Sequence, residues 1–488
     1  MFKSFPVRIY FAAVVLRLIP VFLASDLGIG LDDMFQYDML ARSLAQGHGY
    51  RWYAEVDLKQ LASYVDFDLF SIRDYDPLLG VPTSFRAPLY PTFLSVVYFL
   101  AGTGSSRFFA ARIAQAIFLG APLAPLTYFV AKRLFALPLE EGIMREEFVA
   151  HTSAWIVAAY PMLLIYPLGL GTENPFFVLL MISFLFLLKV VERQTTFNFV
   201  FSGMLLGLAA LTRSVIIAFS LFAILWVWFS LGHKRGAVLL AIAFGLTVGP
   251  WIIRNSLLHG KLTGIETSMG YNLYLGYHPQ GNGSFVFGPS LDLLPILDDA
   301  ERDRIGTEMA IGFIRAEPGR FVPVAVNRLG FIFGLEKRVS MYFYGNNLIG
   351  YVPFPLLLII SAILLLPFVV VSTSAALGLS LLLWRPEHIL LGLLFLGYIA
   401  PHVFILAEDR FHLALVPFIA ILAAQFWANR FSAIWARWKE SRSGQILVLL
   451  SIFCFLLLIT NWGVELARDW DRITQLLGPA GNQSYFPY

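Results

Sequence analysis

The chain has 488 residues, of which 58% are hydrophobic and only 14% are charged. Its mean hydropathy is +0.71, whereas soluble chains carry roughly 25% charged residues. This composition excludes an ordinary soluble protein and predicts an all-α polytopic membrane protein, since several apolar runs approach the ~20 residues that a spanning helix needs. The net charge of +3 carries little information, and we expect no nucleic-acid partner. The single cysteine, Cys454, excludes an internal disulfide.

Twelve apolar runs follow one another along the chain. The first has Lys3 and Arg8 near its start and no small-residue cleavage site after it, so we expect a retained helix with a cytoplasmic N-terminus. The runs lie near residues 6–28, 88–102, 108–131, 149–170, 174–190, 198–212, 215–231, 236–253, 353–384, 387–406, 411–428 and 444–463.

The basic junctions between these runs set the expected topology. Positive loops face the cytoplasm, and the junctions alternate correctly if every run from 108 onward crosses once. The run 88–102 then does not span; it is short, contains Pro88 and Pro91, and is expected to lie in the outer interface, giving eleven spans. In the alternative it spans, and another crossing is miscounted within 353–384. The junctions are "AKRLF" at 131, Lys189 with Arg193, "GHKR" at 232, "WRPEH" at 384 and "NRFSAIWARWKESR" at 429.

On this map two large segments face outward, residues 29–107 and 254–352, and the cytoplasmic loops are too short for a soluble domain. The whole chain, 1–488, is therefore expected to be a single membrane-embedded domain. Any chemistry is expected on the outward face, where the ionisable residues gather.

The first outer segment opens with an acidic pair, Asp32 and Asp33, at the start of an apolar-striped helix over 34–46. An aspartate at this position caps the helix N-terminus, and one aspartate is enough for that. Neighbouring residues at a helix start point in different directions, so one carboxylate can cap while the other faces a cleft. The pair therefore allows a functional interpretation beside the structural one.

Further charged residues gather at the same predicted face. Taken singly, each is a solvated helix end, and an arginine there can snorkel to the surface. Together they combine two chemical abilities, because a carboxylate can act as a general base and arginines bind phosphate through paired hydrogen bonds. The residues are Arg86, Glu173, Arg213, Arg254 with Asn255, and Glu408, Asp409 and Arg410.

In order along the chain, these segments resemble the GT-C superfamily of polyprenyl-phosphate-sugar glycosyltransferases. The resemblance is strongest to the branch of protein O-mannosyltransferases, aminoarabinose transferases and lipopolysaccharide core transferases. It rests on the ordered set, including the tyrosine Tyr37 after the acidic pair, rather than on one motif. The segments are "LDDMFQYDMLARSLAQGHGY", "FRAPLYPTFL", "ARIAQAIFLGAPLAPLTYFVAKRLF", "GLAALTRS", "GPWIIRN", "TSMGYNLYLGYHP" and "EDRFHLALVPFIA".

The resemblance implies an inverting transfer of a sugar from a polyprenyl-phosphate donor to a lipid, glycan or protein acceptor, outside an inner or plasma membrane. It implies that the first acid, Asp32, is the general base, with Asp33 close behind. We expect Asp33 mainly to cap or orient the helix. The second acid is often glutamate in the family, which leaves open which carboxylate acts. Arg254 is the first candidate for the donor phosphate, followed by Arg86, Arg410 and Arg213.

Three further expectations complete the sequence reading. The acids could hold a divalent metal, as in some members of the superfamily, but we expect no metal or other cofactor because the arginines can neutralise a phosphate. Within 254–352 we expect two interfacial helices broken at Pro318 and a loop-like lid over 267–284. The rival from another class is a secondary transporter or flippase, which would place ionisable residues near the bilayer midplane.

Overall fold

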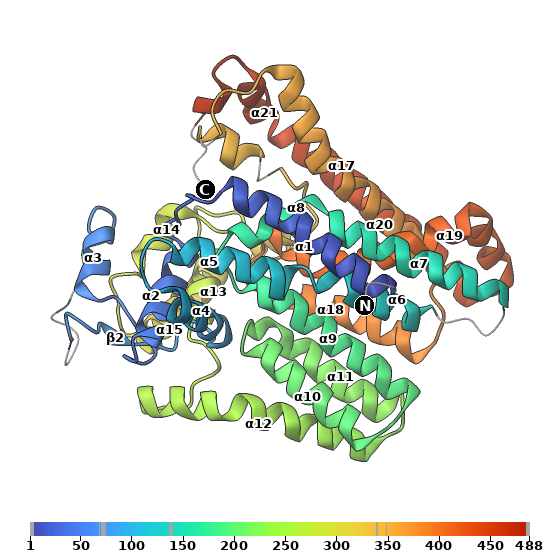
Figure 1. Cartoon of the computed structure of the whole chain (residues 1–488), viewed down its shortest axis with the longest axis horizontal. Coiled ribbons are helices and arrows are strands. Elements are labelled where there is room, and N and C mark those ends of the chain that lie inside the picture. The colour runs from blue at the N-terminus through green and yellow to red at the C-terminus, as the bar shows by residue number, and fades with distance from the viewer. Residues whose placement is uncertain are drawn as a thin grey trace.

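The computed structural model describes the backbone of residues 4–67, 69, 75–135, 140–337, 340–347 and 349–484, and their side chains except those of 140–143 and 342. The described chain is almost entirely helical (Figure 1). Its one sheet within these residues is a two-stranded antiparallel ribbon, in which Arg51 pairs with Pro82 and Trp52 with Val81.

The apolar runs form the expected helices. Within the described residues, eight helical segments are long and apolar enough to span a membrane, and a ninth is formed if the bent pair α7 and α8 is one span. The chain is therefore a multi-pass membrane protein. The spanning segments are α1 (Phe5–Leu23), α5 to α6 (Arg107–Ala114, Leu123–Leu134), α9 (Glu173–Glu192), α12 (Lys234–His259), α17 (Phe354–Gly378), α18 (Pro386–Phe404), α19 (Val416–Glu440) with the 3₁₀ turn η8 (Asp409–Leu415), and α20 (Arg442–Arg468).

Three shorter apolar helices bear on the count of eleven spans. Helices α10 (Thr196–Ala210) and α11 (Ile217–Phe229) pack in one bundle with α9 and α12 (Figure 1), in the places where two spans are expected. Helix α4 (Leu89–Ala101) has 13 residues, about 20 Å at 1.5 Å per residue, and packs on α2 (Asp33–Ala45) instead. The count of eleven stays a prediction. The run 353–384 is continuous through α17 into the turn η7 (Leu379–Leu381), with no sharp bend of the kind expected from the alternative.

A break between α7 (Glu140–Ala159) and α8 (Pro161–Ile165) bends the chain by 53°. Pro161 has no N–H and cannot donate to the carbonyl of Val157. The guanidinium of Arg17 on α1 satisfies the freed carbonyls, with Nη2 3.0 Å from Val157 O and Nη1 3.1 Å from Ala158 O. Arg17 is fully buried. Its side chain, on the apolar helix α1, therefore caps the break between α7 and α8.

Most of the remaining elements gather at one end of the bundle, at the left of Figure 1. Aromatic and aliphatic residues from both large outer segments form a separate small core there, in which Trp52 and Phe85 meet Leu297. The elements are α2, β1 (Arg51–Trp52), α3 (Glu55–Leu61), β2 (Val81–Pro82), α4, α13 (Met269–Tyr277), α14 (Phe287–Asp292) and α15 (Asp299–Ala316). Helix α16 (Phe321–Ile332) packs on α18 and η8 instead, and α21 (Trp470–Leu477) lies at the top of Figure 1.

The second outer segment differs from expectation at two places. Helix α12 continues to His259, so Arg254 and Asn255 lie on a helix and not in a loop. Residues 269–277, expected to be loop-like, form α13, which packs on α15 because Gly270 and Gly306 let the two backbones approach closely. The expected break at Pro318 is confirmed: α15 ends at Ala316, a 3₁₀ turn follows, and α16 begins at Phe321.

The Arg17 contact leads to a stability prediction. Arg17→Leu should lower the free energy of unfolding by about 2–5 kcal/mol, because two buried carbonyls lose their donor at ~1–3 kcal/mol each. Thermal unfolding of the purified protein in detergent measures the change. Arg8→Leu, an exposed arginine on the same helix, is the matched control and should leave the melting temperature unchanged. Equal losses in both variants would contradict the capping role.

Candidate active site

The two aspartates at the start of α2 have different roles. Asp32 is the N-cap, and its Oδ1 accepts a hydrogen bond from the backbone N–H of Met34 at 2.9 Å. Asp33 is the first helical residue, and its carboxylate points to two arginines. The expectation that Asp33 is the cap is therefore wrong. Neither position could be assigned from sequence, because both residues cap well and only the neighbours in space separate them.

Asp33 joins arginines from two distant parts of the chain. Its Oδ1 accepts from Nη2 of Arg86, and its Oδ2 lies 3.5 Å from Nη2 of Arg410. Arg86 also donates through Nε to Gln36 Oε1 at 2.8 Å. Both guanidinium groups are thus held at the N-terminal turn of α2, where Gln36 and Asp33 are one turn apart.

Arg410 is the centre of the cluster. Its Nε lies 2.9 Å from Glu408 Oε2 and 3.7 Å from Oε1 of Glu173, the first residue of α9. Glu173 in turn pairs with Arg213 at 2.6 Å. Six of the charged residues expected at one face therefore form one connected group, called the ion cluster below: Asp33, Glu173, Glu408, Arg86, Arg213 and Arg410.

The arginines of the cluster favour the ionised form of the Asp33 carboxyl group. Burial raises the pKa of Asp33, but the charges of Arg86 and Arg410 outweigh that effect and hold the pKa below its ordinary value. Tyr37, buried beside them under the guanidinium of Arg86, has its pKa raised to about 12, mainly by burial. Tyr37 is therefore a neutral hydrogen-bond donor next to fixed charges. Asp409 begins η8 between Glu408 and Arg410.

Arg254 and Asn255 lie outside the ion cluster. Arg254 Nη1 donates to Thr83 O at 2.5 Å and to Asn255 Oδ1 at 3.0 Å, and its guanidinium covers the ring of Trp251. Asn255 is fully buried and donates to the carbonyls of Gly264 and Ile265. Both residues therefore hold loop backbone. Arg254 binds the segment at Thr83, three residues before Arg86, and Asn255 binds the loop at Gly264 and Ile265.

A buried carboxylate that the sequence did not single out holds the same loop. Asp299, at the start of α15, accepts from Thr83 Oγ1 at 2.5 Å and from Ser84 N at 2.8 Å. Burial raises the pKa of Asp299 despite the charge of Arg302 and these hydrogen bonds. Since Tyr50 also binds the carbonyl of Arg86 at 2.8 Å, the segment carrying Arg86 is anchored on both sides.

Two other polar residues of the site were missed. Gln36 binds Arg86, as described, and Glu266 accepts a hydrogen bond from the hydroxyl of Ser214, the residue after Arg213. Glu266 also contributes to the electrostatic environment of Arg86. A signal was present for Glu266, an acid within the otherwise uncharged stretch "LTGIETSMG", but a lone acid in a loop is usually solvated.

The carboxylates of the cluster are arranged around arginines. Among the residues that the structure describes, no three histidine, cysteine, aspartate or glutamate side chains are grouped so as to hold a metal ion. Asp33, Glu173 and Glu408 each lie within ion-pair distance of a guanidinium. The expectation of a site without metal is not tested by this arrangement and stays a prediction.

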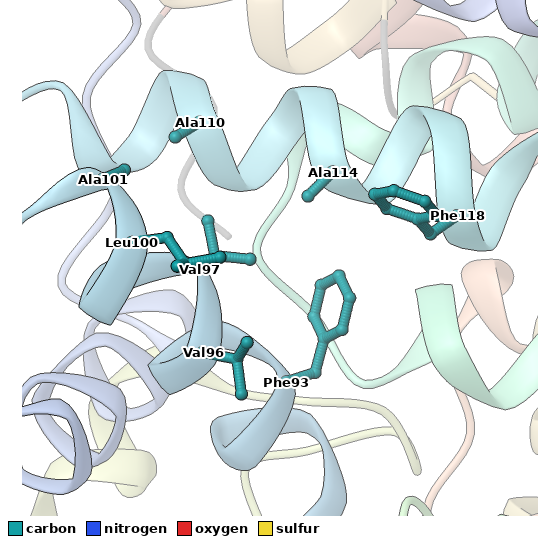
Figure 2. A pocket seen from close by; sticks show the side chains of 8 residues that line it. All are labelled: Phe93, Val96, Val97, Leu100, Ala101, Ala110, Ala114 and Phe118. Atoms are coloured by element: carbon teal, nitrogen blue, oxygen red, sulfur yellow. The ribbon is translucent and has the colours of Figure 1, made fainter.

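An apolar groove lies close to the cluster on the outer surface of α4 (Figure 2). It encloses about 470 Å³ between α4 and the helix formed by α5 and the π-helical segment η2 (Gln115–Gly120). Its walls are almost wholly carbon, with Phe93 and Phe118 at one end and Leu100 near the other (Figure 2). Tyr90 contacts the ring of Phe93 on one side and that of Tyr37 on the other, and so links the groove to the ion cluster.

Comparison with known proteins shows a remote structural likeness. No family model matches the chain, and no curated protein matches it at a significant level. The fold is similar to the crystal structure of ArnT from Cupriavidus metallidurans bound to undecaprenyl phosphate, with a TM-score of 0.38 and 14% sequence identity over 87% of this chain and 79% of that one. A likeness of this size carries no argument about activity, so the function is argued from the site.

The ion pairs of Asp33 predict a pH dependence of stability. A carboxyl with a lowered folded pKa stabilises the fold above its unfolded pKa of ~3.9, and this contribution is lost as the pH falls through the folded value. The melting temperature of the wild type should exceed that of Asp33→Asn by a constant amount between pH 5 and 7, and the gap should close toward pH 3. Asp26→Asn, at an exposed position, is the control. A gap that widens in acid would contradict the pairing.

The clamp by Arg254 predicts a local effect. Arg254→Ala should speed backbone hydrogen exchange in residues 83–89, because the loop loses a charge-assisted hydrogen bond of ~1.5–3 kcal/mol. Arg235→Ala, at the exposed far end of the same helix, is the control. Unchanged hydrogen exchange in residues 83–89 of Arg254→Ala would contradict the role of Arg254 in holding this loop.

Proposed function

We propose that this protein is an integral membrane glycosyltransferase of the GT-C type. It moves a sugar from a polyprenyl-phosphate donor to a lipid, glycan or protein acceptor on the outward face. The observation that carries the proposal is the ion cluster, which joins three arginines to three carboxylates where the membrane helices meet the outer elements. The ordered sequence segments that resemble the superfamily support the same activity.

The arginines suit a phosphate that gains charge during the reaction. A sugar phosphodiester carries one negative charge, and the polyprenyl phosphate that leaves carries a second as the bond to the sugar breaks. Fixed cations therefore interact more strongly with the transition state than with the bound donor. Arg86 and Arg410, which share Asp33, are the first candidates for this contact and replace Arg254, whose guanidinium lies on loop carbonyls.

The apolar groove suits the hydrocarbon of the same donor. Its lining lacks charged residues, and its Phe93 end adjoins Tyr90 and, through Tyr37, Arg86. A lipid with its phosphate at the ion cluster would lay the first part of its chain along α4. In this arrangement the reacting bond stays at the depth of the helix ends while the tail remains in the apolar phase.

We assign the general base to Asp32. Inversion requires the acceptor to approach the sugar on the side away from the phosphate, so the base must lie beyond the arginines that hold the phosphate. Asp32 meets this need because it is exposed and caps α2 through Oδ1, whereas the carboxylate of Asp33 is held by Arg86 and Arg410. It takes the proton of the acceptor hydroxyl or amine as the new glycosidic bond forms, and the polyprenyl phosphate leaves with the bonding electrons.

Substitution of the acidic pair tests these roles. Asp32→Asn retains a capping side chain, so it should fold normally and lose roughly 100- to 10,000-fold in kcat. Asp33→Asn should retain more turnover and raise the donor KM, since it removes the carboxylate that orients Arg86 and Arg410. Turnover by membranes supplied with radiolabelled polyprenyl-phosphate sugars is the measurement.

Each outcome of this assay tests a different part of the proposal. If Asp33→Asn is the inactive variant and Asp32→Asn is not, the base moves to Asp33. If both retain full activity, the acidic pair is only a helix start. A protein that binds such donors without any transfer, and moves them across vesicles instead, would be the transporter or flippase.

The outward direction of the site has its own test. In a Cys454→Ser background, single cysteines at the exposed positions Ser63 and Gln280 should react with a membrane-impermeant maleimide applied to intact cells. A cysteine at Ser432, at the opposite end of the bundle, should not react until the cells are opened. Labelling of position 432 alone from outside would reverse the proposed orientation.

A further inference from the structure

The last turns of α19 form a separate segment that the proposed function does not use. Arg430 has φ +59° and ψ −177° in the middle of the helix, a backbone region essentially restricted to glycine. The helix is therefore kinked at this residue, and residues 431–440 continue in a new direction. Residues 430–442 are called the basic–aromatic segment below.

One side of this segment is apolar and uncovered. Phe431 and Trp435 are 67% and 62% exposed and stand four residues apart, so they lie on one helical face. Lys439 extends the same face, and its ammonium lies 5.0 Å from the ring centre of Trp435. Large exposed aromatic side chains beside a cation are typical of helices that lie in a membrane–water interface.

The charges of the segment are mostly unbalanced. It contains four cations and one acid, Glu440, which pairs with Arg437 at 2.5 Å. The side chains of Arg430, Lys439 and Arg442 make no hydrogen bond or ion pair with any residue that the structure describes. A surface that combines unpaired cations with exposed aromatic rings is complementary to anionic headgroups above a hydrocarbon layer.

The position of the segment along the bundle agrees with this environment. Arg410 of the ion cluster and Arg430 are separated by twenty residues of η8 and α19, which extend over roughly 30 Å at 1.5–2 Å per residue. This is the thickness of the hydrocarbon core of a bilayer. With the ion cluster at one membrane face, the kink at Arg430 therefore falls at the other.

We propose that the basic–aromatic segment is a binding site for anionic phospholipids in the leaflet opposite the ion cluster. Phe431 and Trp435 insert among the upper acyl chains, and Arg430, Lys439 and Arg442 bind headgroup phosphates. The strained residue at position 430 turns the helix so that it runs along the surface instead of into water. This site is independent of the proposed transferase activity.

Lipid-specific quenching of a local probe tests the site in the full-length protein. In a Cys454→Ser background, Ser432→Cys is labelled with the fluorophore NBD and the protein is reconstituted in phosphatidylcholine vesicles. Trace spin-labelled phosphatidylglycerol or phosphatidylcholine is then added. Attraction of ~1 kcal/mol per surface cation corresponds to about a fivefold preference for the anionic quencher at one cation. A probe on Ser63→Cys, in the outer elements, should show no preference.

Charge variants then identify the residues. The triple change Arg430→Gln, Lys439→Gln and Arg442→Gln should keep the quenching by phosphatidylcholine and abolish the preference for phosphatidylglycerol. A control triple removes the same charge from exposed cations elsewhere and should keep that preference; it consists of Lys59→Gln, Lys261→Gln and Arg315→Gln.

Three results would overturn the proposal. They are a probe at position 432 that neither lipid quenches, equal quenching by both lipids in the unmodified segment, and a preference that survives the triple change. The first would show that the segment faces water or a protein partner. Thermal unfolding of each variant confirms that the compared proteins are folded.

Discussion

The guanidinium of Arg410 holds the active end of this protein together. It contacts carboxylates from three places in the sequence, Asp33 on α2, Glu173 on α9 and Glu408 in its own turn. The side chain of Arg410 is only partly exposed and that of Glu173 is buried. A charge removed from water in this way is tolerated only when its partners are also in place, so the contacts favour the meeting of these elements. The same constraint brings Arg86 and Arg213 into the group, because each shares a carboxylate with Arg410. The geometry of the cluster is thus a condition of folding as well as the basis of the proposed phosphate binding.

The outer elements supply the precision that the cluster needs. Asp299 and Arg254, from the second outer segment, bind the backbone of the first at Thr83 and Ser84. Arg86 is carried by the segment that they hold, and its own carbonyl is bound by Tyr50. The guanidinium that we propose for the donor phosphate is therefore placed by an anchored segment, which would reduce the ordering cost on binding.

The proposed donor and the proposed lipid site use the bilayer in complementary ways. At one face, cations are paired with carboxylates and only partly exposed to solvent, which suits the selective binding of one phosphate. At the other face, the side chains of Arg430, Lys439 and Arg442 have no such partners among the described residues, and Lys439 stands beside the exposed ring of Trp435, which suits many exchangeable headgroups. Helix α19 links the two, and its length matches the hydrocarbon layer between them.

Composition and hydropathy alone determined that the chain is an all-α membrane protein, placed a helix at each apolar run, and predicted the break at Pro318. These properties are local, since a helix in lipid depends on a continuous apolar run and a proline interrupts it wherever it stands. The alternation of basic loops also predicted that Asp33, Glu173, Glu408 and the arginines share one face.

Only the tertiary structure decided which of these side chains meet. Asp32 and Asp33 are equivalent as caps, and the choice between them came from Arg86 and Arg410, which lie 53 and 377 positions beyond Asp33. Arg254 could equally have faced a phosphate, and it lies on backbone carbonyls because α12 continues past it toward His259. Helix ends and apolar runs are determined by residues that are neighbours in the sequence. The direction of a charged side chain depends on partners that the fold brings from distant parts of the chain.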